Sequence, residues 1–188
     1  YKAVFDEQSE KGGNKKSAVP HAPYSVSKSL FQKINELNID DCTVSIHNQE
    51  TPDENEFFEK KTGGFIDFFG GFGIPIIDWQ PIGKPSIHYA LENMNPNSRT
   101  LFVHNTMCTT EDISAAHNWS DKVYWATCAN ANLYIENRLP NYQLFMDADA
   151  KMTIGTDSLT SNWQLSILDE MKTIAKYQSY IPFETIIR

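Results

Sequence analysis

The sequence is poor in cysteine, in positive charge and in long hydrophobic runs, and each shortage excludes a class of protein. Its three cysteines, Cys42, Cys108 and Cys128, are unevenly spaced and form no Cys-x-x-Cys motif, which argues against a disulfide framework or zinc knuckle. Lys and Arg number 16 against 24 Asp and Glu, and the net charge of −8 disfavours nucleic acids and anionic membranes as partners. No apolar run reaches the roughly 18 to 20 residues of a membrane span. We therefore expect a cytoplasmic protein with no nucleic-acid and no membrane partner.

The apolar content is nevertheless sufficient for a folded core. Of the 188 residues, 40% are hydrophobic and 12% are aromatic, so a disordered chain is not expected. This length fits one domain or a piece of a larger one. The first residue is Tyr1 and not methionine, from which we expect a chain that begins within a longer protein.

Short apolar runs alternate along the chain with segments of helical periodicity. Strands are expected near residues 17–20, 42–46, 100–103, 122–127 and 151–156, and helices near 27–37, 53–60, 86–94, 109–118, 141–147 and 162–177. This alternation predicts an α/β fold with a parallel sheet and right-handed crossovers. We interpret residues 1–16 as a loop or frayed end, residues 17–177 as the βα units, and residues 178–188 as a truncated continuation.

Two segments of biased composition interrupt this pattern. Residues 130–133 are rich in asparagine and are predicted to form a loop. Residues 62–79 are rich in glycine and phenylalanine, but no Gly-Lys-Ser/Thr follows the glycines, so a phosphate loop is excluded. This second segment is expected to be an apolar helix and turn packed on the body, or alternatively a mobile wall over a site.

The position of the polar residues is the most informative feature of the sequence. His21, His47, His104 and Asp157 each stand at the end of a predicted strand. In barrels and open α/β sheets, the carboxyl ends of the strands form the face where ligands bind. A single histidine at a strand end is commonly a hydrogen-bonded loop residue, but four polar residues on one edge indicate a shared site.

A His-x-x-Glu spacing, formed by His47 and Glu50, lies directly after one of these strands. There an imidazole can face a metal while the carboxylate reaches a substrate. Histidine and aspartate are ordinary ligands of zinc and iron, and a catalytic metal keeps one position open for water. The metal lowers the pKa of that water, while a nearby carboxylate can move the proton. The spacing therefore indicates a metal-dependent hydrolase.

Four segments, taken in order, resemble the motifs of the amidohydrolase superfamily. They are residues 21–25 (HAPYS), 45–50 (SIHNQE), 103–106 (VHNT) and 155–162 (GTDSLTSN). The nearest branch is the chlorohydrolase and deaminase group, which includes triazine hydrolases, guanine deaminase and adenosylhomocysteine deaminase-like enzymes. The resemblance covers residues 17–177. It implies a partial TIM barrel, with strands about four to eight of a (β/α)8 barrel and their helices.

The resemblance also implies a role for each polar residue at the strand ends. His47 would be a metal ligand, and Asp157 both a ligand and the acceptor of a proton from the activated water. Glu50 would carry a proton to the substrate ring nitrogen or to the leaving group. His104 would stabilise the attacked centre or orient the water, and His21 would contact the substrate.

The sequence lacks the His-x-His motif with which this family supplies two further metal ligands from its first strand. We expect those histidines to precede residue 1, so that one divalent metal, zinc or iron, is fully held only in a longer protein. The chain by itself is then expected to be inactive. Because half a barrel leaves two open sheet edges, the chain by itself is also expected either to self-associate or to rearrange.

Three functions remain open at this point. The favoured one is hydrolysis of a C–N bond by metal-activated water, most simply the deamination of an aminated nitrogen heterocycle as small-molecule substrate. The same barrel could instead act on a C–Cl bond or on a cyclic amide. The third is a non-catalytic binding or assembly module. The substrate, the choice between zinc and iron, and the oligomeric state stay open as well.

Overall fold

A parallel sheet of four strands forms the centre of the molecule. The computed structural model describes residues 2–8, 15–38 and 41–187 of the chain. The strands are β1 (Thr43–Asn48), β2 (Arg99–His104), β3 (Val123–Thr127) and β4 (Met152–Ile154), and their order in the sheet is the order in the sequence. All three strand pairs are parallel, so the carboxyl ends of the strands share one edge, as predicted.

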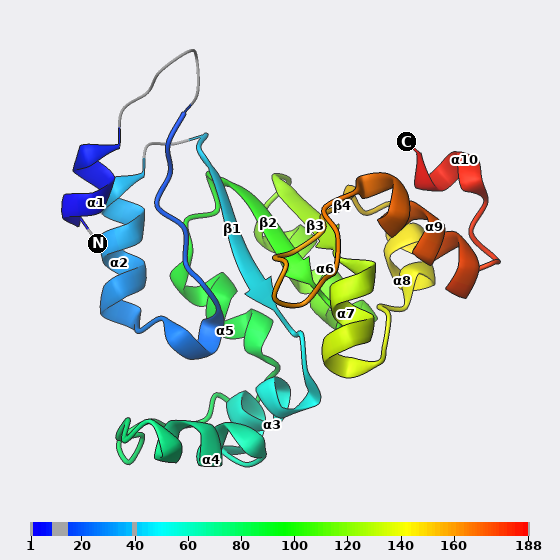
Figure 1. Ribbon diagram of the computed structural model, residues 1–188. Helices are drawn as coiled ribbons and strands as arrows, with labels where there is room; N and C mark the ends of the chain where they lie inside the picture. Colours follow the sequence, from blue (N-terminus) through cyan, green and yellow to red (C-terminus); the bar gives the residue numbers. More distant parts are fainter. Residues whose placement is uncertain (1, 9–14, 39–40, 188) are drawn as a thin grey trace.

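Helices precede, connect and follow the strands (Figure 1). They are α1 (Lys2–Glu7), η1 (Pro23–Ser25), α2 (Lys28–Leu37), α3 (Pro52–Lys60), α4 (Gly64–Gly71), α5 (Ser86–Asn93), α6 (Thr110–Trp119), α7 (Ala129–Glu136), α8 (Tyr142–Asp147), α9 (Ile167–Tyr177) and α10 (Phe183–Ile186). In Figure 1, α3 and α4 project below the carboxyl end of β1, while α8 to α10 gather beside β4. Among the described residues, no helix is long and apolar enough to cross a membrane.

The core lies between the sheet and its helices and is dominated by large aromatic side chains. Phe102 of β2 and Trp125 of β3 are fully buried, with ring centroids 5.3 Å apart, and Phe145 of α8 packs 5.2 Å from Trp125. Such packing fixes the strands relative to one another because a close-packed interior leaves little room for displacement. The strand ends that carry the site are therefore held on a rigid support.

The sequence predicts a fifth strand at residues 17–20, and this prediction is wrong for the described residues. The backbone there runs beside β1 (Figure 1), and Ser17 Oγ donates to the Thr43 carbonyl (2.6 Å). However, the amide and carbonyl of Ala18 bond to the side chain of Asn38 instead of to a strand. Pro20 has no N–H to donate. The segment therefore forms no continuous ladder, although it still brings His21 next to His47.

The N-terminal segment also differs from the prediction of a loop or frayed end. Residues Lys2–Glu7 form the short helix α1, and the Lys16 ammonium group donates to the carbonyls of Phe5 and Gln8. Lys16 also lies 4.5 Å from the centroid of the Phe5 ring. Part of this predicted loop, residues 9–14, lies outside the described residues.

The predicted loop at residues 130–133 is instead the middle of helix α7. Asn130 stands in the first turn of this helix, where its backbone N–H donates to the buried Glu170 carboxylate (2.9 Å). A carboxylate at this end compensates the free N–H groups and the positive end of the helix dipole. Because Glu170 is distant in sequence, composition alone indicates a turn.

The predicted helix at residues 162–177 starts later than expected. Helix α9 begins at Ile167, with Ser166 as its N-cap, and not near residue 162.

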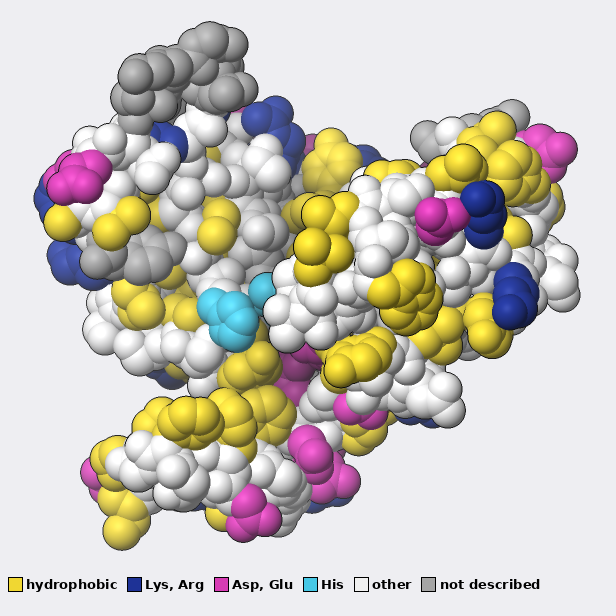
Figure 2. Space-filling view, in the orientation of Figure 1, with side chains coloured by type: hydrophobic (Ala, Val, Ile, Leu, Met, Phe, Trp, Pro, Cys, Tyr) yellow, Lys and Arg dark blue, Asp and Glu magenta, His cyan; other side chains and the backbone are white. Residues whose placement is uncertain are grey.

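The glycine- and phenylalanine-rich segment contains helix α4, which confirms the expected apolar helix. Phe69 of α4 packs 5.3 Å from Phe57 of α3, and Phe65 packs 4.5 Å from Tyr24. Phe68 and Phe72 remain exposed, and Figure 2 shows hydrophobic side chains gathered at the lower left, where α4 lies in Figure 1. Since Tyr24 also contacts His21, α4 stands beside the strand-end residues.

Candidate metal and catalytic centre

Three of the predicted site residues converge at the carboxyl edge of the sheet. His47 is in β1, His104 is the last residue of β2, and Asp157 follows β4. One ligand atom of each lies within 4.8 Å of the others. The His47 ring stacks 5.3 Å from the His104 ring and lies 4.9 Å from the His21 ring. Histidine side chains reach the surface near the middle of the face drawn in Figure 2.

The backbone at this edge adopts an uncommon conformation. His104 (φ 74°) and Asp157 (φ 56°) lie in the left-handed region, as do Gln49 (φ 45°) and Asn105 (φ 58°). This region is unfavourable for residues with a Cβ and is sustained only where surrounding contacts hold it. At the end of β2, Asn105 provides such contacts by donating its side-chain amide to the carbonyls of Phe102 and Ala126.

A hydrogen bond at Nδ1 orients the rings of His47 and His104. His47 Nδ1 lies 2.7 Å from the His21 carbonyl, which can only accept, so Nδ1 carries the proton and Nε2 keeps its lone pair. His104 Nδ1 lies 2.7 Å from Asn132 Oδ1 and donates to it in the same way. Ligating histidines are commonly held by such a bond on the second nitrogen.

The remaining predicted residues surround this pair of rings. Glu50 Oε1 lies 3.4 Å from His104 Nε2, and the Glu50 side chain is 15% exposed, so it reaches the centre from within the protein. Asp157 accepts a hydrogen bond from the Ser161 hydroxyl. His21 is exposed, and its Nδ1 bonds to Ser25 Oγ (2.8 Å). Partial burial, and then His47, lower the pKa of His21, while Glu50 opposes this shift.

A buried carboxylate that the sequence did not single out connects helix α7, which follows β3, to the segment after β4. Glu170 is fully buried and accepts bonds from the backbone and side chain of Asn130, from Asn162 Nδ2 (2.7 Å) and from Gln164 Nε2 (3.1 Å). Asn162 Nδ2 also donates to the Thr156 carbonyl, directly before Asp157. Glu170 thereby fixes both the start of α7, which carries Asn132, and the segment that carries Asp157.

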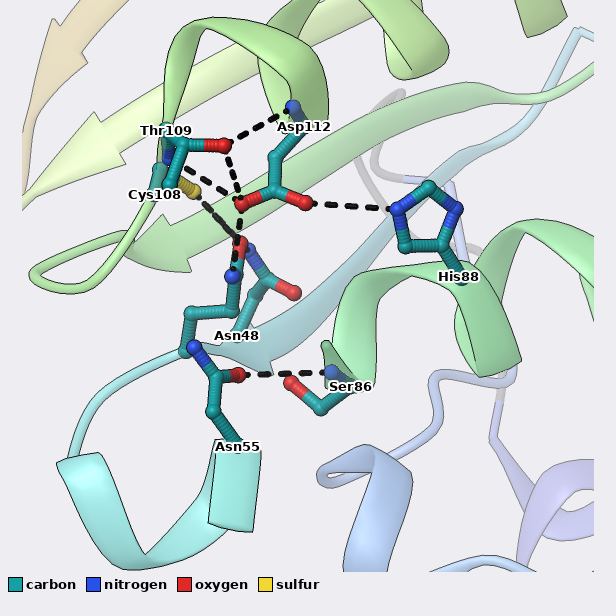
Figure 3. Close-up of polar contacts among 8 residues, drawn as sticks. Asn48, Asn55, Ser86, His88, Cys108, Thr109 and Asp112 are labelled. Atoms are coloured by element: carbon teal, nitrogen blue, oxygen red, sulfur yellow. Dashed lines mark hydrogen bonds and ion pairs between the residues drawn. The ribbon is translucent and has the colours of Figure 1, made fainter. Parts of the chain in front are cut away.

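A second polar network lies where the ends of β1 and β2 meet the start of α6 (Figure 3). Asp112 of α6 accepts bonds from Gln49 Nε2 (3.0 Å) and from the amide and hydroxyl of Thr109, and pairs with His88 Nε2 (3.3 Å). The Cys108 thiol donates to Gln49 Oε1 (2.7 Å). The network joins the turn after β1 to the N-terminus of α6, so the two strand ends are tied together.

The carboxyl of Glu54, at the edge of this network, makes stability depend on pH. Burial raises its pKa from the ordinary 4.5 to about 7, although hydrogen bonds, among them those from the Glu50 and Gln49 amides, oppose the shift. A carboxyl with a raised folded-state pKa favours the folded state below its unfolded pKa, and this contribution is lost as the pH rises through the folded pKa. We expect it to fall by at most about 3 kcal/mol between pH 4.5 and 7.

Urea unfolding of the full-length protein near pH 5 and near pH 8 measures this effect. The unfolding midpoint should decrease less over this interval in Glu54→Gln than in the wild type. Glu56→Gln, a change at an exposed position of the same helix, should keep the wild-type decrease. Equal decreases in all three proteins would contradict the assignment to Glu54.

Comparison with known proteins finds similarity to a family of hydrolases. A model of the amidohydrolase family matches residues 4–184. Adenosine deaminase of Helicobacter pylori is 28% identical over 153 residues, which cover 81% of this chain and 37% of that protein. The 5-methylthioadenosine/S-adenosylhomocysteine deaminase of Bacillus cytotoxicus is 26% identical over 164 residues, covering 86% of this chain and 32% of the relative.

The solved structures give the same fold. That of Helicobacter pylori aminofutalosine deaminase with methylthio-coformycin matches with a TM-score of 0.79 and 23% identity, over 98% of this chain and 44% of the other. The expected partial barrel of this family is thereby confirmed, and the chain spans about a third of the length of the curated relatives it matches. Because the family model covers nearly the whole sequence, the chain belongs to the amidohydrolase family.

Proposed function

We propose that the full-length protein is a metal-dependent hydrolase that removes the amino group from an aminated purine nucleoside or a similar nitrogen heterocycle. The observation that carries this proposal is the convergence of His47, His104 and Asp157 within 4.8 Å, with Glu50 3.4 Å from His104. Two imidazoles, a ligating carboxylate and a separate proton-carrying carboxylate are the groups that hydrolytic deamination requires. The names of the curated relatives, which are deaminases of adenosine derivatives, support the substrate class.

The donor groups fit a divalent transition metal. Neutral imidazole nitrogen and carboxylate oxygen suit zinc or iron, and the His21 carbonyl fixes His47 with Nε2 free to bind. His47 and Asp157 would hold the ion, and His104 lies within reach of the same position. Two further histidines are expected from the rest of the protein. When bound, the metal supplies hydroxide near neutral pH.

The residues of this chain would then carry out proton transfer, orientation of the water and contact with the substrate. Asp157 takes the proton of the attacking water, and the Ser161 hydroxyl steadies its carboxylate. Glu50 delivers a proton to the ring nitrogen or to the departing amine, since its carboxylate faces the centre from within the protein. His104, with its ring fixed by Asn132, orients the water or stabilises the attacked carbon. His21 is exposed beside His47 and contacts the substrate.

Turnover of a substrate panel by the purified full-length protein tests the proposal. Ammonia release is measured with adenosine, 5′-methylthioadenosine, S-adenosylhomocysteine and guanine, and chloride release with a chlorinated triazine. Metal content is measured on the same sample, and one tightly bound zinc or iron per chain is expected. Ammonia from a purine supports the proposal. Chloride release alone would favour a chlorohydrolase, and no turnover of any compound by the metal-loaded protein would favour a binding module.

A further inference from the structure

The turn that presents Glu50 is held by groups that take no part in the proposed chemistry. Glu50 follows Gln49, whose φ of 45° places it in the left-handed region. Two peptide groups leave β1 at this point, and both N–H groups face the protein interior. A glutamate on an unsupported turn could adopt several rotamers, so a fixed position facing His104 needs a specific restraint.

That restraint is the carboxylate of Glu54, which is 1% exposed. Glu54 Oε1 accepts the Gln49 N–H (3.1 Å), and Glu54 Oε2 accepts the Glu50 N–H (3.1 Å). Glu54 stands three residues after the N-cap Thr51 of α3, where a glutamate commonly reaches back to the N-cap amide. Here it reaches past the N-cap to the two preceding amides, so the start of α3 is fastened to the end of β1.

A second buried carboxylate holds the other side of the same turn. Asp112 binds the Gln49 side chain (3.0 Å), and the Met107 N–H donates to the Gln49 carbonyl (3.0 Å). Figure 3 shows Asp112 of α6 facing His88 of α5. The side chain, the backbone N–H and the backbone carbonyl of Gln49 are thus all hydrogen-bonded. Burial of a carboxylate is costly unless its oxygens are hydrogen-bonded, and Glu54 meets that condition with the backbone of the catalytic turn.

We propose that Glu54 is a positioning residue for Glu50. By accepting both amides at once, it keeps Gln49 in the left-handed conformation and directs the Glu50 carboxylate to His104. The inference rests on the proposed function for the role of Glu50. Glu54 itself touches no reacting group, and it acts through the backbone.

The test compares Glu54→Gln with Glu56→Gln in the full-length, metal-loaded protein. Glutamine fills the same volume, but its amide nitrogen cannot accept, so one of the two N–H groups loses its partner. We expect kcat of Glu54→Gln to fall on the order of 10- to 100-fold while KM changes less than about threefold, because a small misplacement of a catalytic group affects the reaction more than binding. Glu56→Gln, at an exposed position of α3, should behave as the wild type.

Hydrogen–deuterium exchange resolved to single amides gives a second readout that needs no activity. The Gln49 and Glu50 amides should be protected in the wild type and should exchange at least about tenfold faster in Glu54→Gln, with amides of β2 and β3 unchanged. Wild-type amides that exchange as fast as those of exposed loops would overturn the inference, even if the variant does not fold. Equal kcat in both variants would overturn it as well. A wild type without turnover but with this exchange pattern would instead refute the proposed function and leave the restraint by Glu54 confirmed.

Discussion

Replacement of Asp157 by asparagine in the full-length protein is expected to lower kcat about 10³- to 10⁴-fold. Asparagine keeps the shape of the side chain and can still accept from the Ser161 hydroxyl. It cannot take a proton, and its neutral oxygen is a weaker metal ligand than a carboxylate. The loss therefore combines the missing base with reduced metal affinity. Steady-state kinetics of ammonia release, together with metal content after dialysis, separates these two effects.

Asp149→Asn is the matched control for this variant. Asp149 precedes β4, is exposed, and also lies in the left-handed region (φ 49°), so the chemical change and the backbone conformation are the same. We expect it to retain wild-type kcat and metal content. If Asp157→Asn also keeps full activity, the centre is not a hydrolytic site and a binding or assembly role is favoured.

Glu50→Gln is expected to lower kcat about 10²- to 10³-fold while leaving metal content at the wild-type level. Its carboxylate lies 3.4 Å from His104, and an amide in that position can neither receive nor deliver a proton. Because no hydrogen bond or ion pair joins this carboxylate to His47 in the described part of the chain, ion binding should be preserved. Kinetics over a range of pH, with metal analysis of the same samples, provides the measurement.

A comparison of two substrates shows where the Glu50 proton goes. A 6-chloropurine nucleoside loses chloride, which needs no proton to depart, whereas adenosine loses an amine, which does. A smaller loss with the chloro compound would assign the proton to the leaving group, and an equal loss would assign it to the ring nitrogen. Wild-type kcat in Glu50→Gln for both substrates would remove Glu50 from the mechanism.

The sequence predicts which side chains converge at the site, but it does not predict which residues hold them in place. His47, His104 and Asp157 lie at or just after the carboxyl ends of strands of a parallel sheet, and these ends meet at one edge, so their proximity follows from chain order. The residues that hold these side chains in place lie in segments whose local sequence does not indicate that role. Asn132 is in a segment with turn composition, yet it lies in α7 and fixes the His104 ring. Glu170 gives no signal before its partners in α7 and in the segment after β4 are known.

The predicted strand at residues 17–20 shows a similar limit. The apolar run there has the composition of a strand, but the Asn38 side chain, beyond α2, bonds the Ala18 peptide groups. A single sequence does not reveal such a distant competitor for backbone hydrogen bonds.

The expected self-association of the chain stays a prediction. It concerns the two edge strands of the described sheet, β1 and β4. An apolar cavity of about 530 Å³, lined by Ile154, Ile174 and Ile181 among others, adjoins β4.

The left-handed residues at the strand ends have a consequence for engineering. Selection for thermostability alone would favour glycine at positions such as 104 and 157, because glycine adopts a positive φ without steric cost, whereas the histidine and aspartate do not. Variants selected in this way would therefore become more stable while losing side chains of the proposed reaction centre. A stabilisation programme should hold these positions constant and place its substitutions on the outward faces of the helices.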